Sequence, residues 1–257
     1  MRKHIPSLAF AALCFASFGA AHATEAPKSL QPAVVFVHGA FADGSSWSKV
    51  ISILQAKGVK AVAVQNALDS LGGDVAATKR AIENQPGRVV LVGHSWGGTV
   101  ITEAGGHDQV AALVYVAAFA PSVGQSSSEL GKDYPPAPGL ANLAPDKAGY
   151  LWLSDEGLRK YFAQDLPKSD LDVMVATQGP VAAKAFDEKV STAAWTTKPS
   201  WYIVAENDHM IVPKLQHALA KKIGAKVTSL PTSHVPQQSR PVDVAKVILA
   251  AVKASRK

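Results

Sequence analysis

Cysteine is almost absent from this chain of 257 residues, in which Cys14 is the only one. A single thiol cannot form an intrachain disulfide, and it cannot supply the thiolate ligands of a structural zinc site. The histidines also lack the H-E-x-x-H spacing of a zinc-binding helix. The sequence therefore excludes a disulfide-stapled domain and a thiolate metal site, and we expect neither a metal nor another cofactor.

Long hydrophobic runs are lacking as well. The apolar stretch from Leu8 to Ala20 is too short to span a membrane as a stable helix. It follows the basic start Arg2-Lys3 and precedes Ala21-His22-Ala23, which fits an A-x-A cleavage site. We expect residues 1–23 to be a signal peptide, so that the mature protein is exported and is periplasmic or secreted. An uncleaved membrane anchor is the alternative interpretation.

The chain has no strong excess of one charge. Its 26 Lys and Arg residues exceed its 20 Asp and Glu residues only modestly, and removal of Arg2 and Lys3 with the leader leaves 24 against 20. The positive charges are spread along the chain, apart from three in the tail 253–257. Nucleic-acid binding needs a clustered basic surface. We therefore expect no nucleic-acid partner and no stable membrane insertion, and the oligomeric state stays open.

Strand and helix patterns alternate along the chain, and they indicate the fold class. Such alternation is typical of an α/β fold with a mostly parallel, doubly wound sheet and helices on both faces. We therefore predict that residues 24–257 form one domain around a sheet of about six strands. The expected strands are 33–37, 60–64, 88–92, 111–117, 200–205 and 226–230, and the expected helices are 47–57, 73–85, one from Ser95, 213–222 and 242–253.

The most informative motif is Gly93-His94-Ser95-Trp96-Gly97. It follows a strand pattern and opens a helical pattern, which is the context that a nucleophile elbow requires. The two glycines leave room where strand and helix approach closely, and the helix N-terminus favours negative charge beside the serine. The motif indicates that Ser95 is a nucleophile. The alternative is a plain strand-to-helix turn with a serine cap.

A nucleophilic serine needs a base and an orienting acid. In proteins with a nucleophile elbow, these residues follow along the chain in the order serine, acid, histidine. Asp208 and His234 each follow a late strand pattern, so both are expected at the carboxyl edge of the sheet. A loop histidine there can take the proton of Ser95 while Asp208 holds the ring tautomer. Glu206 is the competing acid, and we favour Asp208 for its place in the loop.

The loop after the first strand pattern, residues 38–41, predicts an oxyanion hole. Its small residues let the backbone approach a ligand, and we expect the N–H of Ala40 to act together with that of Trp96. Loss of one such donor typically costs about 3 to 4 kcal/mol of transition-state stabilisation. His38 and His94 are expected to be packed or hydrogen-bonded supports rather than bases.

Four segments, VHGAFADGSSW, GHSWGG, AENDHMIVP and SHVP, together resemble the signature of the α/β-hydrolase superfamily. Within it, the chain is similar to the branch of plant methylesterases, salicylic-acid-binding esterases and hydroxynitrile lyases, with related bacterial esterases. The resemblance implies the α/β-hydrolase fold. It also implies a triad of Ser95, Asp208 and His234, with Ala40 and Trp96 as oxyanion donors.

Two positions bear on the reaction within this branch. The lyases have a threonine directly after the strand-end histidine and a lysine directly after the catalytic histidine. This chain has Gly39 and Val235 at those positions. The resemblance therefore implies ester hydrolysis, whereas the identity of the ester does not carry over.

The segment from about residue 121 to 198 interrupts the alternation. It begins with Ser and Pro residues and continues with helical patterns near 155–165 and 169–189. An insertion at this place lies over the carboxyl edge of the sheet, so we predict a helical lid that shapes the substrate pockets. The candidate pocket residues are Phe41, Phe119, Trp152 and Met210, and for the last three a place in the core is an equally open interpretation.

These features predict a serine carboxylester hydrolase that forms an acyl-enzyme with a small-molecule ester of small or medium size, apolar or aromatic. Acyl transfer, perhydrolysis and hydroxynitrile-lyase-type chemistry on the same triad are alternatives. A ligand-binding protein with little activity could also keep this fold. An intact set of nucleophile, base and acid argues against a pure binder, because binding does not require all three.

Overall fold

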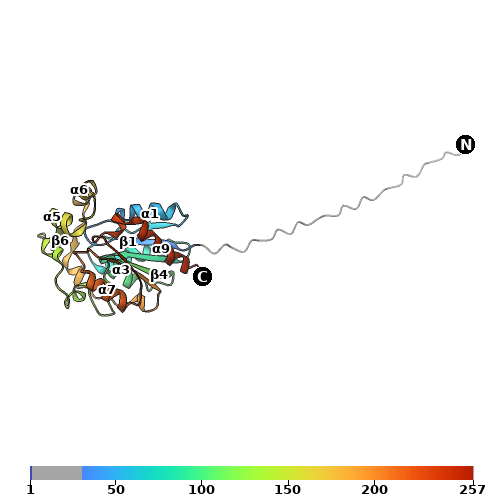
Figure 1. The fold of residues 1–257 in the computed structure, drawn as a ribbon. Helices are drawn as coiled ribbons and strands as arrows, with labels where there is room; N and C mark the ends of the chain where they lie inside the picture. The colour runs from blue at the N-terminus through green and yellow to red at the C-terminus, as the bar shows by residue number, and fades with distance from the viewer. Residues whose placement is uncertain (2–30, 257) are drawn as a thin grey trace.

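A six-stranded sheet forms the centre of the computed structural model, which describes Met1 and residues 31–256 (Figure 1). Residues 2–23 of the predicted signal peptide lie outside the described residues. All neighbouring strands are parallel, in the order β2-β1-β3-β4-β8-β9, and each agrees with a predicted strand to within two residues. The strands are β1 (Ala33–Val37), β2 (Ala61–Ala63), β3 (Val89–His94), β4 (Val110–Val116), β8 (Ser200–Ala205) and β9 (Lys226–Leu230).

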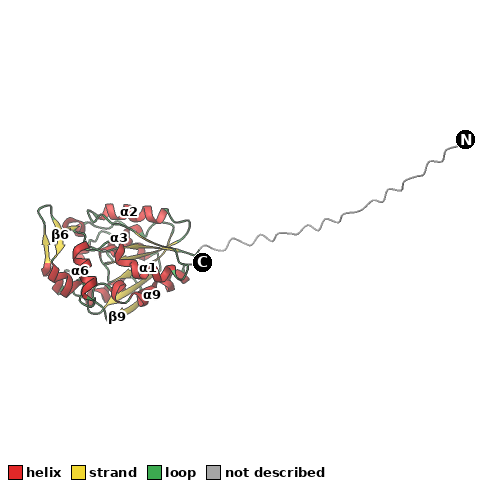
Figure 2. Ribbon diagram, turned by 90° about the horizontal axis from the view of Figure 1, so that it is seen from above, coloured by secondary structure: helices red, strands yellow, loops and turns green. Residues whose placement is uncertain are grey.

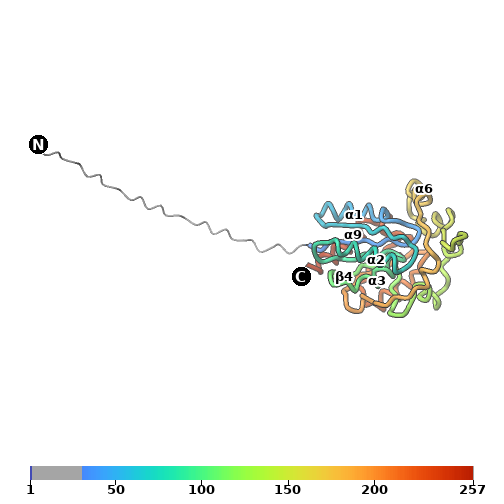
Figure 3. The backbone as a smooth tube through the Cα atoms, turned by 180° about the vertical axis from the view of Figure 1, so that it is seen from behind, coloured from blue at the N-terminus to red at the C-terminus, as the bar shows by residue number. Residues whose placement is uncertain are grey.

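Helices cover both faces of the sheet because the buried strands present apolar side chains alternately to each face. In β1, Val34 and Phe36 pack in one cluster with α1 and α9, whereas Val35 and Val37 pack in another with α2, α3 and α7. Figure 3 shows α1 and α9 next to each other, and α2 and α3 next to each other. This arrangement confirms the predicted α/β-hydrolase fold class. The helices are α1 (Ser48–Gln55), α2 (Leu71–Glu83), α3 (Trp96–Ala104), α7 (Pro213–Lys222) and α9 (Pro241–Ala254).

The strand order reverses beside β1, because the chain first adds β2 on one side and then β3 on the other. The loops that leave the carboxyl ends of β1 and β3 therefore diverge and leave a crevice between them. In this chain those loops are the segment 38–41 and the elbow at Ser95. The topology thus places two predicted parts of the site side by side.

The segment between β4 and β8 forms a lid at the carboxyl end of the strands, away from the C-terminus (Figures 1 and 2). It contains the expected short helices and, in addition, a three-stranded antiparallel sheet that the sequence analysis did not predict. Its elements are α4 (Ser127–Leu130), β5 (Leu143–Pro145), β6 (Tyr150–Leu153), α5 (Asp155–Gly157), the π-helix Leu158–Phe162, α6 (Lys168–Thr177) and β7 (Val181–Ala182).

The helix predicted over 169–189 is wrong in its second half. α6 ends at Thr177, and Pro180 follows shortly before β7. Proline has no N–H for a helix and disfavours helical backbone in the residue before it. The remaining short helices of the chain are Gly44–Trp47, Pro138–Asn142, Ala183–Asp187, Ala194–Thr196 and Pro236–Ser239. Within residues 31–256, no helix is long and apolar enough to cross a membrane.

Candidate active site

Ser95 lies at a sharp turn between β3 and α3. Its backbone has φ 52° and ψ −119°, a conformation that a residue with a side chain rarely adopts. The turn is tight on both sides: a Cβ on Gly93 would lie 2.5 Å from the carbonyl oxygen of Gly97. A Cβ on Gly97 would lie 2.5 Å from the carbonyl oxygen of Val37. Both positions of the motif therefore exclude side chains, and the serine projects from the turn.

A continuous chain of hydrogen bonds joins the three residues predicted to act together. The Oγ of Ser95 lies 2.8 Å from Nε2 of His234, and Nδ1 of His234 lies 2.6 Å from Oδ2 of Asp208. All three residues are buried. Because Nδ1–H donates to the carboxylate, the lone pair of Nε2 faces the serine hydroxyl and can accept its proton.

The carboxylate of Asp208 is held by more than the histidine. Its Oδ1 accepts the backbone N–H groups of Met210 at 2.7 Å and Ile211 at 3.0 Å. Its Oδ2 also accepts Nε2–H of Gln216 at 2.7 Å. These bonds fix the orientation of the carboxylate toward the ring. Gln216 was not among the predicted site residues, although its place on the buried face of α7, beside Leu215, was a usable signal.

Glu206, the competing acid, lies elsewhere. Its Oε1 is 3.0 Å from Nε2 of His217, and both side chains are substantially exposed to solvent. An acid that orients the base must contact Nδ1 of that base, and in this structure Asp208 makes the contact. The geometry therefore favours Asp208.

Two backbone donors adjoin the serine. The N–H groups of Ala40 and Trp96 donate no hydrogen bond to any part of the chain that the structure describes. Trp96 is the first residue of α3, where N–H groups have no partner within the helix. Ala40 belongs to the loop 38–41, which lies close to the serine. A Cβ added to Gly39 of this loop would lie 2.8 Å from Cβ of Ser95. Both donors are thus available to an anionic oxygen beside the serine.

A buried carboxylate holds the side chain of Trp96. Its Nε1–H donates to Oδ2 of Asp74 at 2.9 Å, while Oδ1 of Asp74 accepts the backbone N–H of Leu68 at 3.0 Å. Burial raises the pKa of the Asp74 carboxyl, and the bond from Trp96 opposes that rise. Asp74 was not among the predicted site residues, although it falls at helical spacing with the other buried positions of α2. These are Leu71, Val75, Thr78 and Ile82.

Two neutral histidines support the loops. Nε2–H of His94 donates to the backbone carbonyl of His234 at 2.7 Å, and the two rings lie 4.8 Å apart between centroids. Nδ1–H of His38 donates to the carbonyl of Gly39 at 2.9 Å, while its Nε2 accepts the N–H of Asn66 at 2.9 Å. Burial lowers the pKa of both rings, and that of His94 lies well below its ordinary value.

These two histidines predict a pH-dependent stability. Since their folded pKa lies below the unfolded value of about 6.5, the unfolded chain binds more protons as the pH falls through that value. The free energy of unfolding should therefore be maximal above about pH 7 and should fall toward pH 5. Urea unfolding at several pH values measures this. The variant His94→Gln should show a shallower loss than the wild type. Equal slopes for the two proteins would contradict the assignment.

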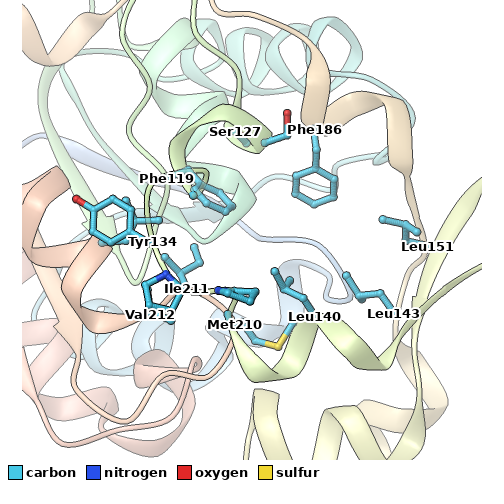
Figure 4. A pocket seen from close by; sticks show the side chains of 16 residues that line it. Phe119, Ser127, Tyr134, Leu140, Leu143, Leu151, Phe186, Met210, Ile211 and Val212 are labelled. Carbon is cyan, nitrogen blue, oxygen red and sulfur yellow. The ribbon is translucent and has the colours of Figure 1, made fainter.

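A cavity of about 310 Å³ lies under the lid (Figure 4). The backbone N–H of Phe119, one of its walls, donates to the carbonyl of Ser95 at 3.2 Å, and Met210 is bonded to Asp208. The cavity therefore adjoins the site, and none of the described residues that line it carries a charged side chain. Its walls are Phe119, Ser127, Ser128, Gly131, Tyr134, Pro135, Pro136, Ala137, Leu140, Leu143, Leu151, Phe186, Met210, Ile211, Val212 and Leu215.

Two other residues predicted as pocket walls lie outside this cavity. Trp152 is 40% exposed, because alternate residues of β6 face opposite sides and Leu151 is the one that faces the cavity. Phe41 lines a separate cavity of about 240 Å³ between α1 and α6, and its ring packs edge-on against Phe162. Phe41 and Trp152 thus lie outside the cavity under the lid, and their role in substrate binding stays a prediction.

Comparisons with known proteins agree with this architecture. An α/β hydrolase of Aspergillus novofumigatus is 26% identical over 243 residues, which cover 85% of this chain and 96% of the relative. A pyrethroid hydrolase of Sphingobium wenxiniae is 26% identical over 248 residues, 84% of this chain and 85% of the relative. The crystal structure of a methylesterase from Arabidopsis has a TM-score of 0.71 at 23% identity, with 87% of this chain and 99% of that chain covered.

A family-wide comparison covers most of the chain. The pattern of the alpha/beta hydrolase family matches residues 34–247, from the first strand into the last helix. The match includes the elbow and the loops that carry the acid and the histidine, and it confirms that the chain is an enzyme of the hydrolase class. On this evidence of sequence and fold, the chain belongs to the alpha/beta hydrolase family.

Proposed function

We propose that the protein is a serine carboxylester hydrolase in which Ser95 is the nucleophile, His234 the general base and Asp208 the orienting acid. The observation that carries the proposal is the continuous hydrogen-bonded chain, with 2.6 Å from Asp208 to His234 and 2.8 Å from His234 to Ser95. Nucleophile, base and orienting group within hydrogen-bond reach are the signature of this chemistry.

The reaction follows from these contacts. Oγ of Ser95 attacks the ester carbonyl as Nε2 of His234 takes its proton, and the N–H groups of Ala40 and Trp96 bind the resulting oxyanion. The imidazolium of His234 then protonates the leaving alcohol, and an acyl-enzyme remains on Ser95. Water attacks the acyl-enzyme with His234 again as base, which releases the acid and restores the serine.

The cavity under the lid supports an apolar or aromatic group on the ester. Its walls carry no charge and include Phe119, Phe186 and Met210, which suit an aromatic or aliphatic group. A volume of about 310 Å³ is near the lower end of small-molecule sites. Relatives named methylesterase and pyrethroid hydrolase also support a small organic substrate.

Ester hydrolysis should greatly exceed cyanide release from a cyanohydrin. Cyanohydrin cleavage needs a proton acceptor for the substrate hydroxyl and a positive group for the departing cyanide. The lyases that this chain resembles use a threonine and a lysine here, whereas Gly39 and the buried Val235 offer neither a hydroxyl nor a charge. A threonine at position 39 would also crowd the site, since its Cβ would lie 2.8 Å from that of Ser95.

The test compares acid release from p-nitrophenyl, methyl and aryl esters with cyanide release from mandelonitrile on the same protein preparation. The expected result is turnover of at least one ester class with little or no cyanide. Efficient cyanide release together with inactivity on every ester would show that the choice of reaction is wrong.

A further inference from the structure

A short lid segment, residues 162–165, meets the two loops that carry the acid and the base. We call these the acid loop, residues 206–212, and the histidine loop, residues 231–235. The segment begins at the last residue of the π-helix Leu158–Phe162. π-Helices are rare in proteins, and those that occur are often found at functional sites. At Ala163 the backbone leaves helical geometry, with φ −140° and ψ 37°, and the chain turns along the two loops.

Asp165 binds the residue directly before the base. Its Oδ2 accepts the backbone N–H of Ser233 at 2.9 Å, and its Oδ1 accepts Oγ–H of Ser233 at 2.5 Å. Ser233 is buried, while Asp165 is exposed on the lid side. Both bonds have a carboxylate acceptor, so they are stronger and more directional than bonds between neutral groups. Asp165 thereby fixes the start of the peptide that presents His234.

Gln164 binds the residue directly before the acid. Its Nε2–H donates to the carbonyl of Asn207 at 2.7 Å, one residue before Asp208. On the other side of Asp208, the carbonyl of His209 accepts the N–H of Gly139, which also belongs to the lid, at 2.9 Å. The acid loop is thus held by the lid on both sides of its carboxylate.

The same segment also contacts the ring of the base. Phe162 packs edge-on against His234, with 5.0 Å between ring centroids and 66° between planes. Three residues of this segment therefore contact the acid loop or the histidine loop. They are Phe162, Gln164 and Asp165. The ion pair between Asp170 and Lys49 of α1 is a lid attachment that touches neither loop.

We propose that Gln164 and Asp165 are positioning residues that set the separation and alignment of the acid and the base. Both act through the neighbouring residues Asn207 and Ser233, and neither contacts the reacting atoms. The proposal rests on the proposed hydrolase function. Small displacements of catalytic groups cost large factors in rate, on the order of 10²-fold for 1 Å. A lid that holds both loops would therefore contribute to turnover without contacting the substrate.

The experiment compares Asp165→Ala with Asp165→Asn, with Gln164→Ala, and with Asp170→Ala as a matched lid control. The readouts are kcat and KM on the best ester, the rate at which a fluorophosphonate labels Ser95, and the low-field proton resonance of the His234 to Asp208 hydrogen bond. Circular dichroism establishes that each variant is folded.

Asp165→Ala should lower kcat and the labelling rate by roughly 10- to 100-fold with little change in KM, and it should shift or broaden the proton resonance. Gln164→Ala should do the same to a smaller degree. Asp165→Asn should recover most of the rate, because the amide oxygen can accept the Ser233 N–H and the hydroxyl can turn to accept from the amide. Asp170→Ala should resemble the wild type.

The proposal is overturned if folded Asp165→Ala keeps wild-type kcat and resonance, or if Asp165→Asn is as impaired as Asp165→Ala. Should Asp165→Ala fail to fold, Ser233→Ala removes one of the two bonds and keeps the other, and an unchanged rate and resonance in that variant would also overturn it. If the fluorophosphonate did not label the wild type, the hydrolase function would be refuted instead. The proton resonance would still test whether Gln164 and Asp165 position the acid and the base.

Discussion

Ser95→Ala is expected to lower ester turnover by roughly 10⁴-fold or more, while the protein stays folded. The hydroxyl makes one side-chain contact, with Nε2 of His234, and the strained backbone at φ 52° is the same in both proteins. Removal of Oγ therefore removes the attacking atom and little packing. Assays of ester turnover on the best substrate measure the loss of activity. Thermal unfolding of both proteins measures any change in stability.

Selective labelling controls for a trace of another hydrolase. A fluorophosphonate should modify the wild type at Ser95 and should leave Ser95→Ala unlabelled. Ser46→Ala is a matched control, because the hydroxyl of Ser46 is also buried and has no hydrogen-bond partner among the described residues. That variant should keep its activity. If pure Ser95→Ala retained most of the turnover, the serine mechanism would have to be abandoned.

Asp208→Asn is expected to reduce turnover by roughly 10³- to 10⁴-fold with the fold preserved. If the amide oxygen accepts from Met210 and Ile211, the amide nitrogen must face Nδ1 of His234 and Nε2 of Gln216, which are donors in the wild type. The histidine then favours the tautomer with Nδ1 as acceptor, and Nε2–H points at the serine. That tautomer cannot take the serine proton.

Glu206→Gln serves as the comparison for this prediction. Glu206 pairs with His217 at the surface, and its substitution should change turnover little, since exposed ion pairs contribute weakly. Turnover is measured for both variants at the pH optimum of the wild type. A large loss in Glu206→Gln with a small loss in Asp208→Asn would move the acid to Glu206 and leave the rest of the mechanism in place.

Local patterns in the sequence were sufficient for the sheet and for the elbow. Five of the six strands are short apolar runs, and the edge strand β9 has only the apolar residues Val227 and Leu230. Turn signals separate the six strands, so their number and place follow from the chain itself. The elbow is equally local: Gly93, Ser95 and Gly97 lie within five residues, and the close approach that excludes a Cβ occurs between their own backbones and β1. The parallel topology then directs the ends of β8 and β9, with their acid and histidine, to the same edge.

The lid and the partners of the site depended on contacts that no local pattern specifies. Helical periodicity continued past Thr177. Pro180 is a local signal against a longer helix, whereas the pairing of β7 with β6 that redirects the chain is a contact between separate segments. The orientation of Trp152 away from the cavity followed from the register of that small sheet.

The polar partners of the site show the same limit. Three of these contacts join segments that pack together only in the folded chain. They are Asp74 with Trp96, Asp165 with Ser233, and Gln216 with Asp208. A buried or loop-bound polar side chain is recognisable in sequence as unusual, but its partner is chosen by packing between distant elements. Tertiary structure therefore determined how the site is held, while short-range sequence determined which residues could react.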